Sequence, residues 1–290
     1  MDFECIVVGA GPAGLSAALT LGRARRRTLV LDSGKPRNHA ARAMHGVLGH
    51  DGLSPAALKA RGIEEVRRYG IEVRSADVSE ARALDDGGFE IDGLTTDTII
   101  LATGMLDDTP PVDGFAEIYG ISAHTCPYCD GFEHGDTRIA VYAAGEAAEH
   151  MGPLLRQWSD DVIVLDPADV TRFVSTDGRL AHVELAGGES IERDALFFHV
   201  GMQPRADLAV QLGCALTEAG FVESAPADRQ TSVDGVYAVG NCADPMLNVP
   251  MSIADGARAA VFVNVRLLDL PSPAAHETAA TEQDAFVTKA

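Results

Sequence analysis

Two cysteines near the middle of the chain carry the clearest chemical signal. Cys126 and Cys129 are separated by Pro127 and Tyr128, a spacing that allows a small disulfide ring. Thiols in such a motif commonly have a lowered pKa, because nearby donors or a helix start stabilise the thiolate. A thiolate attacks a substrate disulfide or resolves a mixed one, so the pair predicts thiol–disulfide exchange.

Zinc binding is the main alternative for a Cys-x-x-Cys pair. Structural zinc sites typically use four ligands, often from two such pairs, and this chain has a single one. His182 and Glu184 have the letters of a zinc deaminase motif, but they follow the cysteine pair instead of preceding it. We therefore expect redox chemistry and no metal. The other cysteines stand alone and are expected to be small buried hydrophobes: Cys5, Cys214 and Cys242.

A glycine-rich turn near the N-terminus predicts a dinucleotide site. Gly9-x-Gly11-x-x-Gly14 follows an apolar stretch, residues 4–8, and opens a run of helix formers. Gly9 permits the tight turn, Gly11 lets the backbone approach a pyrophosphate, and Gly14 allows close helix–sheet packing. The start of the helix supplies N–H donors for phosphate. Asp32, at the end of the next predicted strand, can accept hydrogen bonds from ribose hydroxyls.

The rest of the chain alternates strand and helix patterns. A second strand–turn–helix–strand unit is predicted over residues 138–166, and a late strand, residues 235–239, precedes a long helix, residues 252–268. This alternation predicts an α/β fold with two Rossmann-like, three-layer units, in which helices cover both faces of parallel sheets. Residues 271–290 are rich in Ala, Thr and Glu with little periodicity, so we expect a mobile or partner-docked tail.

Three segments make the sequence resemble the thioredoxin reductase family of flavoproteins. They are Gly9-Ala-Gly-Pro-Ala-Gly14, Leu101-Ala-Thr-Gly104 and Gly235-Val-Tyr-Ala-Val-Gly240-Asn241. The resemblance implies a discontinuous FAD domain, residues 1–113 and 229–290, around a middle domain, residues 114–228. Asn241 stands where the family has Asp; it still donates and accepts hydrogen bonds but carries no charge. The residues that the resemblance assigns to FAD are Gly9, Gly11, Pro12, Ala13, Gly14, Asp32, Ser33, Ala102, Thr103, Gly240 and Asn241.

The same resemblance implies roles around the cysteine pair. Cys129 would face the flavin and exchange electrons with it, and Cys126 would attack or release the substrate. Asp130 would serve as acid and base for the leaving thiol. His124 is a second candidate for proton transfer, and a hydrogen-bonded structural histidine is an equally good interpretation of it.

The second Rossmann-like unit lacks the features with which thioredoxin reductases bind NADPH. Its turn reads Ala143-Ala-Gly-Glu-Ala-Ala148, with Ala in place of the first glycine. The next strand ends at Asp166, and Asp169 follows, where a basic cluster would bind the 2′-phosphate; Arg172 is the nearby cation. We interpret this site as degraded. A functional site with unusual residues is the alternative, and NADH could still use Asp166.

A flavoprotein with a dithiol pair and no pyridine nucleotide must pass its electrons elsewhere. The sequence also resembles the FAD-dependent dithiol oxidases of gliotoxin- and holomycin-type antibiotic biosynthesis, through Cys126-Pro-Tyr-Cys129, residues 32–38 and residues 45–52. This resemblance implies that Arg37 and His45 lie along the FAD. It also implies that a small-molecule dithiol becomes a disulfide, with O2 as acceptor and H2O2 as product. A thioredoxin reductase driven by NADPH or ferredoxin is the second hypothesis, and a flavin-binding redox sensor is the third.

The composition of the whole chain limits its partners. The chain has 290 residues and a net charge of -20, which repels phosphate backbones and anionic lipid, so we expect no nucleic acid and no membrane partner. We recognise no targeting segment, and no stretch approaches the roughly 20 apolar residues that span a bilayer. We therefore expect a cytoplasmic protein. The family resemblance implies a homodimer.

Overall fold

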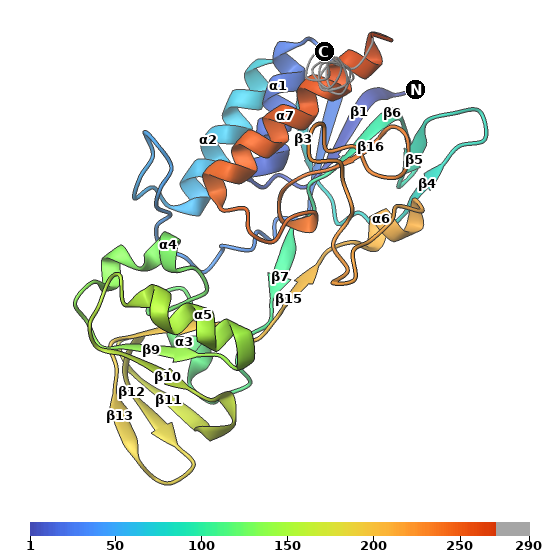
Figure 1. Ribbon diagram of the computed structural model, residues 1–290. Helices are drawn as coiled ribbons and strands as arrows, with labels where there is room; N and C mark the ends of the chain where they lie inside the picture. Colours follow the sequence, from blue (N-terminus) through green and yellow to red (C-terminus); the bar gives the residue numbers. More distant parts are fainter. Residues whose placement is uncertain (271–290) are drawn as a thin grey trace, which may run out of the picture. The chain divides into compact units, whose positions relative to one another are not determined.

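The chain forms two compact units in the computed structural model, which describes residues 1–270 (Figure 1). The first unit contains residues 1–36, residues 59–105 and the described chain from residue 204 onwards. The second contains residues 37–58 and 106–203. The chain passes between them through β7 (Met105–Asp107) and β15 (Met202–Pro204), which pair as a two-stranded sheet. The predicted tail, residues 271–290, lies outside the described residues.

The first unit is built on one mixed sheet with the order β3-β2-β1-β6-β5-β4, and β16 also pairs with β6. β1, β2, β3, β6 and β16 run parallel to one another, whereas β5 pairs antiparallel with both β6 and β4 at the edge. The strands are β1 (Phe3–Val8), β2 (Thr28–Asp32), β3 (Glu72–Ser75), β4 (Ala81–Ala83), β5 (Phe89–Ile91), β6 (Leu94–Leu101) and β16 (Val236–Ala238).

Both faces of this sheet are buried, which explains why its central strands are almost continuously apolar. Successive side chains of a strand point to opposite faces, so Val7 packs under the helices and Ile6 packs on the other side. The helical face carries α1 (Pro12–Arg23), α2 (Pro55–Arg68) and α7 (Val249–Leu267), which lie side by side in Figure 1. The other face is covered by α6 (Asp207–Gln211) and the irregular chain that follows it.

The second unit has three layers around a parallel sheet with the order β10-β9-β14-β8. One face packs against α5 (Gly145–Leu155), and the other packs against an antiparallel sheet of β11, β12 and β13. The parallel strands are β8 (Ala123–His124), β9 (Ile139–Tyr142), β10 (Val162–Leu165) and β14 (Ala195–Phe198); the antiparallel strands are β11 (Val170–Thr176), β12 (Arg179–Leu185) and β13 (Ser190–Glu192). Its short helices are α3 (Phe115–Ile118), α4 (Pro127–Asp130), η1 (Phe132–His134) and η2 (Pro167–Asp169).

The two predicted Rossmann-like units are confirmed, and two details differ. Helices were expected on both faces of the second sheet, but alternating apolar residues such as Phe173 and Val183 make strands that bury one face instead. The compact units also divide at 105 and 204, whereas the sequence suggested 113 and 228. Val112 packs into the core of the second unit, while Leu208 and neighbouring residues pack into the first. Within residues 1–270, no helix is long and apolar enough to cross a membrane.

Candidate functional site

The cysteine pair lies at the start of the short helix α4 in the second unit. Cys126 and Cys129 form a disulfide, with their Cα atoms 5.3 Å apart. Cys126 is the N-cap of the helix, and its carbonyl accepts hydrogen bonds from the N–H groups of Cys129 (3.1 Å) and Asp130 (3.2 Å). Pro127 begins the helix, which suits its fixed φ and missing N–H group. The turn thus holds the two sulfur atoms at bonding range, as the spacing predicted.

Asp130 and His124 lie together, and a third residue extends the group. Asp130 Oδ1 is 3.2 Å from His124 Nδ1. His124 Nε2 is 2.9 Å from Nε2 of His134, which lies in η1 and is buried. Burial, with the neighbouring His124 as a second cause, lowers the pKa of His134 to about 4. His134 is therefore neutral near pH 7 and accepts or donates one hydrogen bond to His124.

His134 is a residue that the sequence interpretation missed. It lies ten positions after His124, beyond the helix that carries the cysteines. The spacing has no helical or strand period that would place the two rings on one face. The contact depends on the turn at Gly131, where a side chain would clash with the carbonyl of Pro127 and the ring of Trp158.

Two aromatic side chains beside the disulfide are exposed. Tyr128 is 73% exposed and Phe132 is 83% exposed. Tyr128 packs its edge against Trp158, with ring centroids 5.8 Å apart, so its ring is held although it faces solvent. Exposed aromatic surface of this kind is often used for binding.

The glycine-rich turn of the first unit has the close contacts that its motif predicts. Gly9 has φ +108°, and a Cβ there would clash with the carbonyl oxygen of Ala102; a Cβ at Gly14 would clash with the carbonyl of Gly9. Gly11 is different, because no atom lies within 4 Å of its ideal Cβ position. Open space over Gly11, at the N-cap of α1, is what a bound pyrophosphate needs.

Asp32 faces this turn from the end of β2. Its Oδ1 accepts a hydrogen bond from the N–H of Ala10 at 2.9 Å. Its Oδ2 accepts from the N–H of Gly34 at 3.2 Å and from Lys59 Nζ, on α2, at 2.6 Å. Lys59 was not singled out in the sequence, because nothing in its local pattern links it to β2. The carboxylate is thus fixed beside the turn, where it could accept hydrogen bonds from ribose hydroxyls.

The late Gly240-Asn241 segment also belongs to the first unit. The N–H of Gly240 donates to the buried carboxylate of Asp255 at 2.9 Å, and Asp255 is paired with Arg229. The Asn241 amide donates to the carbonyls of Asp244 (3.0 Å) and Leu247 (2.9 Å). A carboxylate cannot donate these hydrogen bonds, so Asn at this position has a structural reason.

The remaining predicted FAD residues fall into two groups. Ala102 and Thr103 follow β6 and contact the first unit: the N–H of Ala102 donates to Val8, and Thr103 Oγ1 donates to the carbonyl of Arg205. Arg37 and His45 belong to the second unit. Arg37 makes a two-point ion pair with Asp107, at 2.6 and 2.8 Å. His45 lies 3.6 Å from Asp51 and 3.5 Å from Glu133, and contact of these two residues with FAD stays a prediction.

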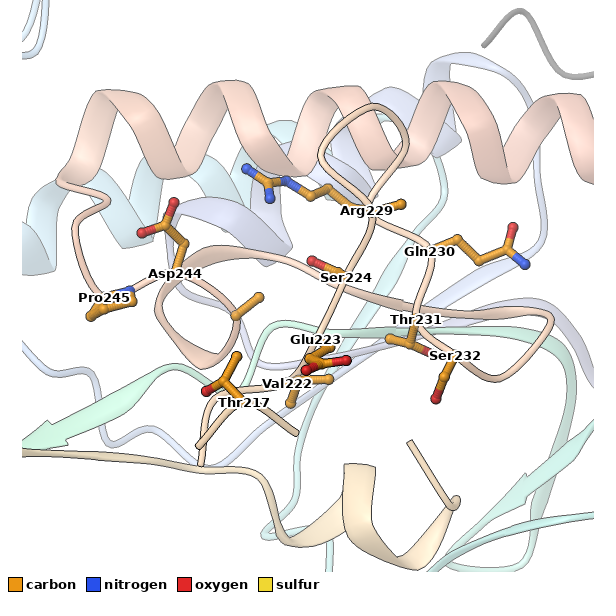
Figure 2. Close-up of a pocket in the computed structure, with 12 residues that line it drawn as sticks. Thr217, Val222, Glu223, Ser224, Arg229, Gln230, Thr231, Ser232, Asp244 and Pro245 are labelled. Carbon is orange, nitrogen blue, oxygen red and sulfur yellow. The ribbon is translucent and has the colours of Figure 1, made fainter. Parts of the chain in front are cut away.

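A pocket of about 550 Å³ opens elsewhere on the first unit (Figure 2). Its lining includes Ser224, Arg229, Gln230 and Asp244. None of the residues predicted to bind FAD or to carry the thiol chemistry lines it. It nevertheless adjoins the Gly240-Asn241 segment, because Asn241 donates to the carbonyl of Asp244, which lines the pocket.

The nucleotide turn of the second unit keeps the middle glycine, as Gly145, and differs from the first in its other features. Ala143, in place of the first glycine, is buried. Asp166 accepts a hydrogen bond from the N–H of Ala168 at 2.9 Å, so its carboxylate caps η2. Arg172 pairs with Asp113 at 3.2 Å. The one acid and the nearby cation are both engaged locally, which argues against a 2′-phosphate site there.

The three single cysteines are buried, as predicted. Burial raises the pKa of Cys5 to about 12 and also raises the pKa of Cys214 and of Cys242. These thiols are unreactive at neutral pH. Among residues 1–270, no group of three or more His, Cys, Asp or Glu has the arrangement of a metal site.

The fold and the paired cysteines define a class of flavin-dependent oxidoreductases that act on sulfur groups. The chain matches the family model for pyridine nucleotide-disulphide oxidoreductases over residues 3–169 and 159–260, and it belongs to that family. Thioredoxin reductase sirT from Leptosphaeria maculans is 32% identical over 92% of this chain and 94% of its own length. Thioredoxin reductase aclD from Aspergillus oryzae is 32% identical over 90% and 95%. The crystal structure of HlmI superposes with a TM-score of 0.86 at 35% identity, covering 100% of this chain and 98% of HlmI. The resemblance to thioredoxin reductase-like flavoproteins is thereby confirmed.

Proposed function

We propose that this protein is an FAD-dependent dithiol oxidase that closes a disulfide in a small molecule, with O2 as the final acceptor. The observation that carries the proposal is the state of the second nucleotide site, where Asp166 caps its own helix and Arg172 pairs with Asp113. If the protein does not bind NADPH, the simplest entry for electrons is the disulfide of Cys126 and Cys129.

FAD fits the first unit. The open space over Gly11, the start of α1 and the fixed carboxylate of Asp32 suit a pyrophosphate and a ribose. Ala102, Thr103 and Gly240 would complete the cradle from the ends of β6 and β16. When bound, the flavin would take two electrons from the cysteine pair and give them to O2, which yields H2O2.

The protein's own residues would carry out the thiol exchange. One substrate thiol gives its proton to Asp130, and its sulfur bonds to Cys126 while the Cys126–Cys129 bond breaks and Cys129 leaves as thiolate. Asp130 releases the first proton to solvent and accepts the proton of the second substrate thiol, whose sulfur attacks the first substrate sulfur, and Cys126 leaves with the electron pair. The substrate has lost two protons and two electrons, and the electrons reside on the cysteine pair. The exposed rings of Tyr128 and Phe132 would bind an apolar part of the substrate.

An anaerobic reduction experiment tests this function. The purified flavoprotein is mixed without oxygen with dithiothreitol, with NADPH or with NADH, and the flavin absorbance is followed. We expect rapid bleaching by the dithiol, little bleaching by either nucleotide, and recovery of the absorbance with stoichiometric H2O2 when air is admitted. A flavin that no dithiol bleaches contradicts the proposal.

Thioredoxin reductase activity is the second candidate, because the curated relatives at about one-third identity carry that name. Rapid flavin reduction by NADPH, followed by turnover of thioredoxin, would establish it. The predicted homodimer and cytoplasmic location are parts of the proposal; sedimentation of the holoprotein tests the first, and fractionation of producing cells tests the second.

A further inference from the structure

His124 has no ring nitrogen left for a substrate. Its Nδ1 is 3.2 Å from Asp130 and its Nε2 is 2.9 Å from His134. Its side chain is 9% exposed, whereas that of Asp130 is 23% exposed. Of the two proton-transfer candidates, the carboxylate is therefore the one that can meet a thiol.

We propose that His134 is a positioning residue, which holds the His124 ring through its Nε2 so that His124 supports Asp130, and Asp130 alone exchanges protons with the substrate thiol. This inference rests on the proposed function and deepens it. The order Asp130–His124–His134 runs from a partly exposed carboxylate to a buried ring. The chain of contacts joins α4, β8 and η1, three short elements that the fold brings together.

The surroundings of His134 keep its ring neutral. Removal from water is the main cause of its lowered pKa, and the charges that act on it are those of His124, Asp130, Arg179 and Asp194. Its ring also packs edge-on against Phe197, with centroids 6.1 Å apart. A neutral imidazole exchanges the roles of donor and acceptor by changing its tautomer. His134 can therefore keep its hydrogen bond to His124 Nε2 whether that nitrogen donates or accepts.

This arrangement has a consequence for Asp130. When the carboxylate is charged, His124 donates from Nδ1 and accepts or shares a proton at Nε2, so the ring cannot turn away. The contact with His124 then fixes Asp130 Oδ1, and the position of Oδ1 in turn sets the direction in which the other carboxylate oxygen points. Without His134, the His124 ring loses one of its two anchors, and the orientation of the carboxylate becomes less defined.

The test compares holoenzyme variants in anaerobic stopped-flow reduction by dithiothreitol, between about pH 5 and about pH 9. We expect His134→Phe to slow flavin reduction about 10-fold, the effect of one lost hydrogen bond on a barrier, and to change the shape of the pH profile. His134→Gln keeps a polar group that both donates and accepts, and should recover most of the rate and the profile. His182→Phe, which removes a histidine 3.8 Å from Glu184 on β12, is the matched control and should behave as the unaltered protein.

Two results would overturn the inference. One is an unchanged rate and pH profile in His134→Phe. The other is an equal slowing in the Phe and Gln variants with an unaltered profile, which would mean that His134 only packs. If His134→Phe fails to retain flavin, His134→Asn replaces it, because its amide is one methylene shorter than that of Gln and falls short of His124. Reduction of the flavin by a dithiol is measured in all of these, so a failure of the oxidase proposal, seen as NADPH-driven turnover, is distinguished from a failure of this one.

Discussion

The two strand–turn–helix units of this protein share a topology and differ in what their turns can hold. Between β1 and α1, a side chain at Gly9 or at Gly14 would clash with backbone, and the space over Gly11 is open. Between β9 and α5, Ala143 is buried and Gly145, with φ +56°, has no atom within 4 Å of its ideal Cβ position. Gly145 is the counterpart of Gly11, so the open position is common to both turns. The two tightly packed glycines are found in the first turn, and Ala143 and Ala148 stand in their places in the second.

The two units also differ in the acid at the end of their second strand, which is Asp32 in β2 and Asp166 directly after β10. Asp32 reaches back to the N–H of Ala10, inside the glycine-rich turn. Asp166 instead bonds forward to Ala168 and caps η2. An acid after a strand therefore belongs to a cofactor site when it faces the turn, and its presence in the sequence does not decide which way it faces. The first unit has the turn geometry that a dinucleotide would need, and the second unit carries the cysteine pair.

The largest expected effect separates these two roles. Cys126→Ser removes the sulfur that would bond to the substrate, and we expect dithiol oxidation to fall at least about 1,000-fold, because the nucleophile of a covalent step is lost. Flavin content should not change, because Cys126 is not among the residues predicted to hold FAD, most of which belong to the first unit. Turnover with a small dithiol and the flavin absorbance of the purified protein measure both. Cys214→Ser, at a buried thiol outside the pair, is the control, and substantial turnover in Cys126→Ser would contradict the assignment.

The next effect contrasts the glycines of the two turns. Gly9→Ala places a Cβ against the carbonyl of Ala102 at φ +108°, so the backbone must shift; we expect loss of bound flavin and about 2–4 kcal/mol of destabilisation. Gly145→Ala has open space and a less strained φ of +56°, and should cost about 1 kcal/mol with flavin retained. Thermal unfolding and flavin content measure both variants. Equal losses of flavin and of stability in the two variants would contradict the proposed difference between the turns.

Much of this contrast could be predicted from the sequence. The fingerprint Gly9-x-Gly11-x-x-Gly14 and the cysteine spacing are local patterns whose geometry follows from a few adjacent residues, and both have the predicted form. Ala143 and the acid at Asp166 also led to the interpretation that the second turn does not bind NADPH, which stays a prediction.

The contacts between distant segments could not be predicted in this way. Lys59 reaches Asp32 from a helix 27 positions later, and His134 meets His124 through a turn at Gly131. The domain limits differ for a related reason: residues after 204 have no motif of their own, and their place in the first unit depends on packing of side chains such as Leu208. Such contacts depend on tertiary packing, which the periodicity of the sequence does not report.

A pH dependence of stability should mark the second unit. Burial lowers the pKa of His134 from 6.5 to about 4, so between these values the unfolded chain binds a proton that the folded chain does not. Stability from this group is present above about pH 6.5 and is lost as the pH falls towards 4, by up to about 3 kcal/mol. Denaturant unfolding across this range measures it. His134→Phe should flatten that part of the curve, and an equally steep curve in the variant would show that other groups cause it.

The smallest effect compares the cations near the two acids. Lys59 holds Asp32 at 2.6 Å and Arg172 lies near Asp166 in sequence but pairs with Asp113. Lys59→Met keeps the length of the side chain and removes the charge, which frees the carboxylate that would accept the ribose; we expect FAD affinity to fall about 10-fold, the effect of one charge-assisted hydrogen bond. Arg172→Met is the matched change in the second unit and should leave FAD affinity unchanged. Titration of the apoprotein with FAD, followed by fluorescence, gives both dissociation constants. A weaker affinity in Arg172→Met would mean that the surroundings of the second nucleotide turn contribute to the cofactor site, beyond the contacts predicted for Arg37 and His45, and would contradict the contrast between the two turns.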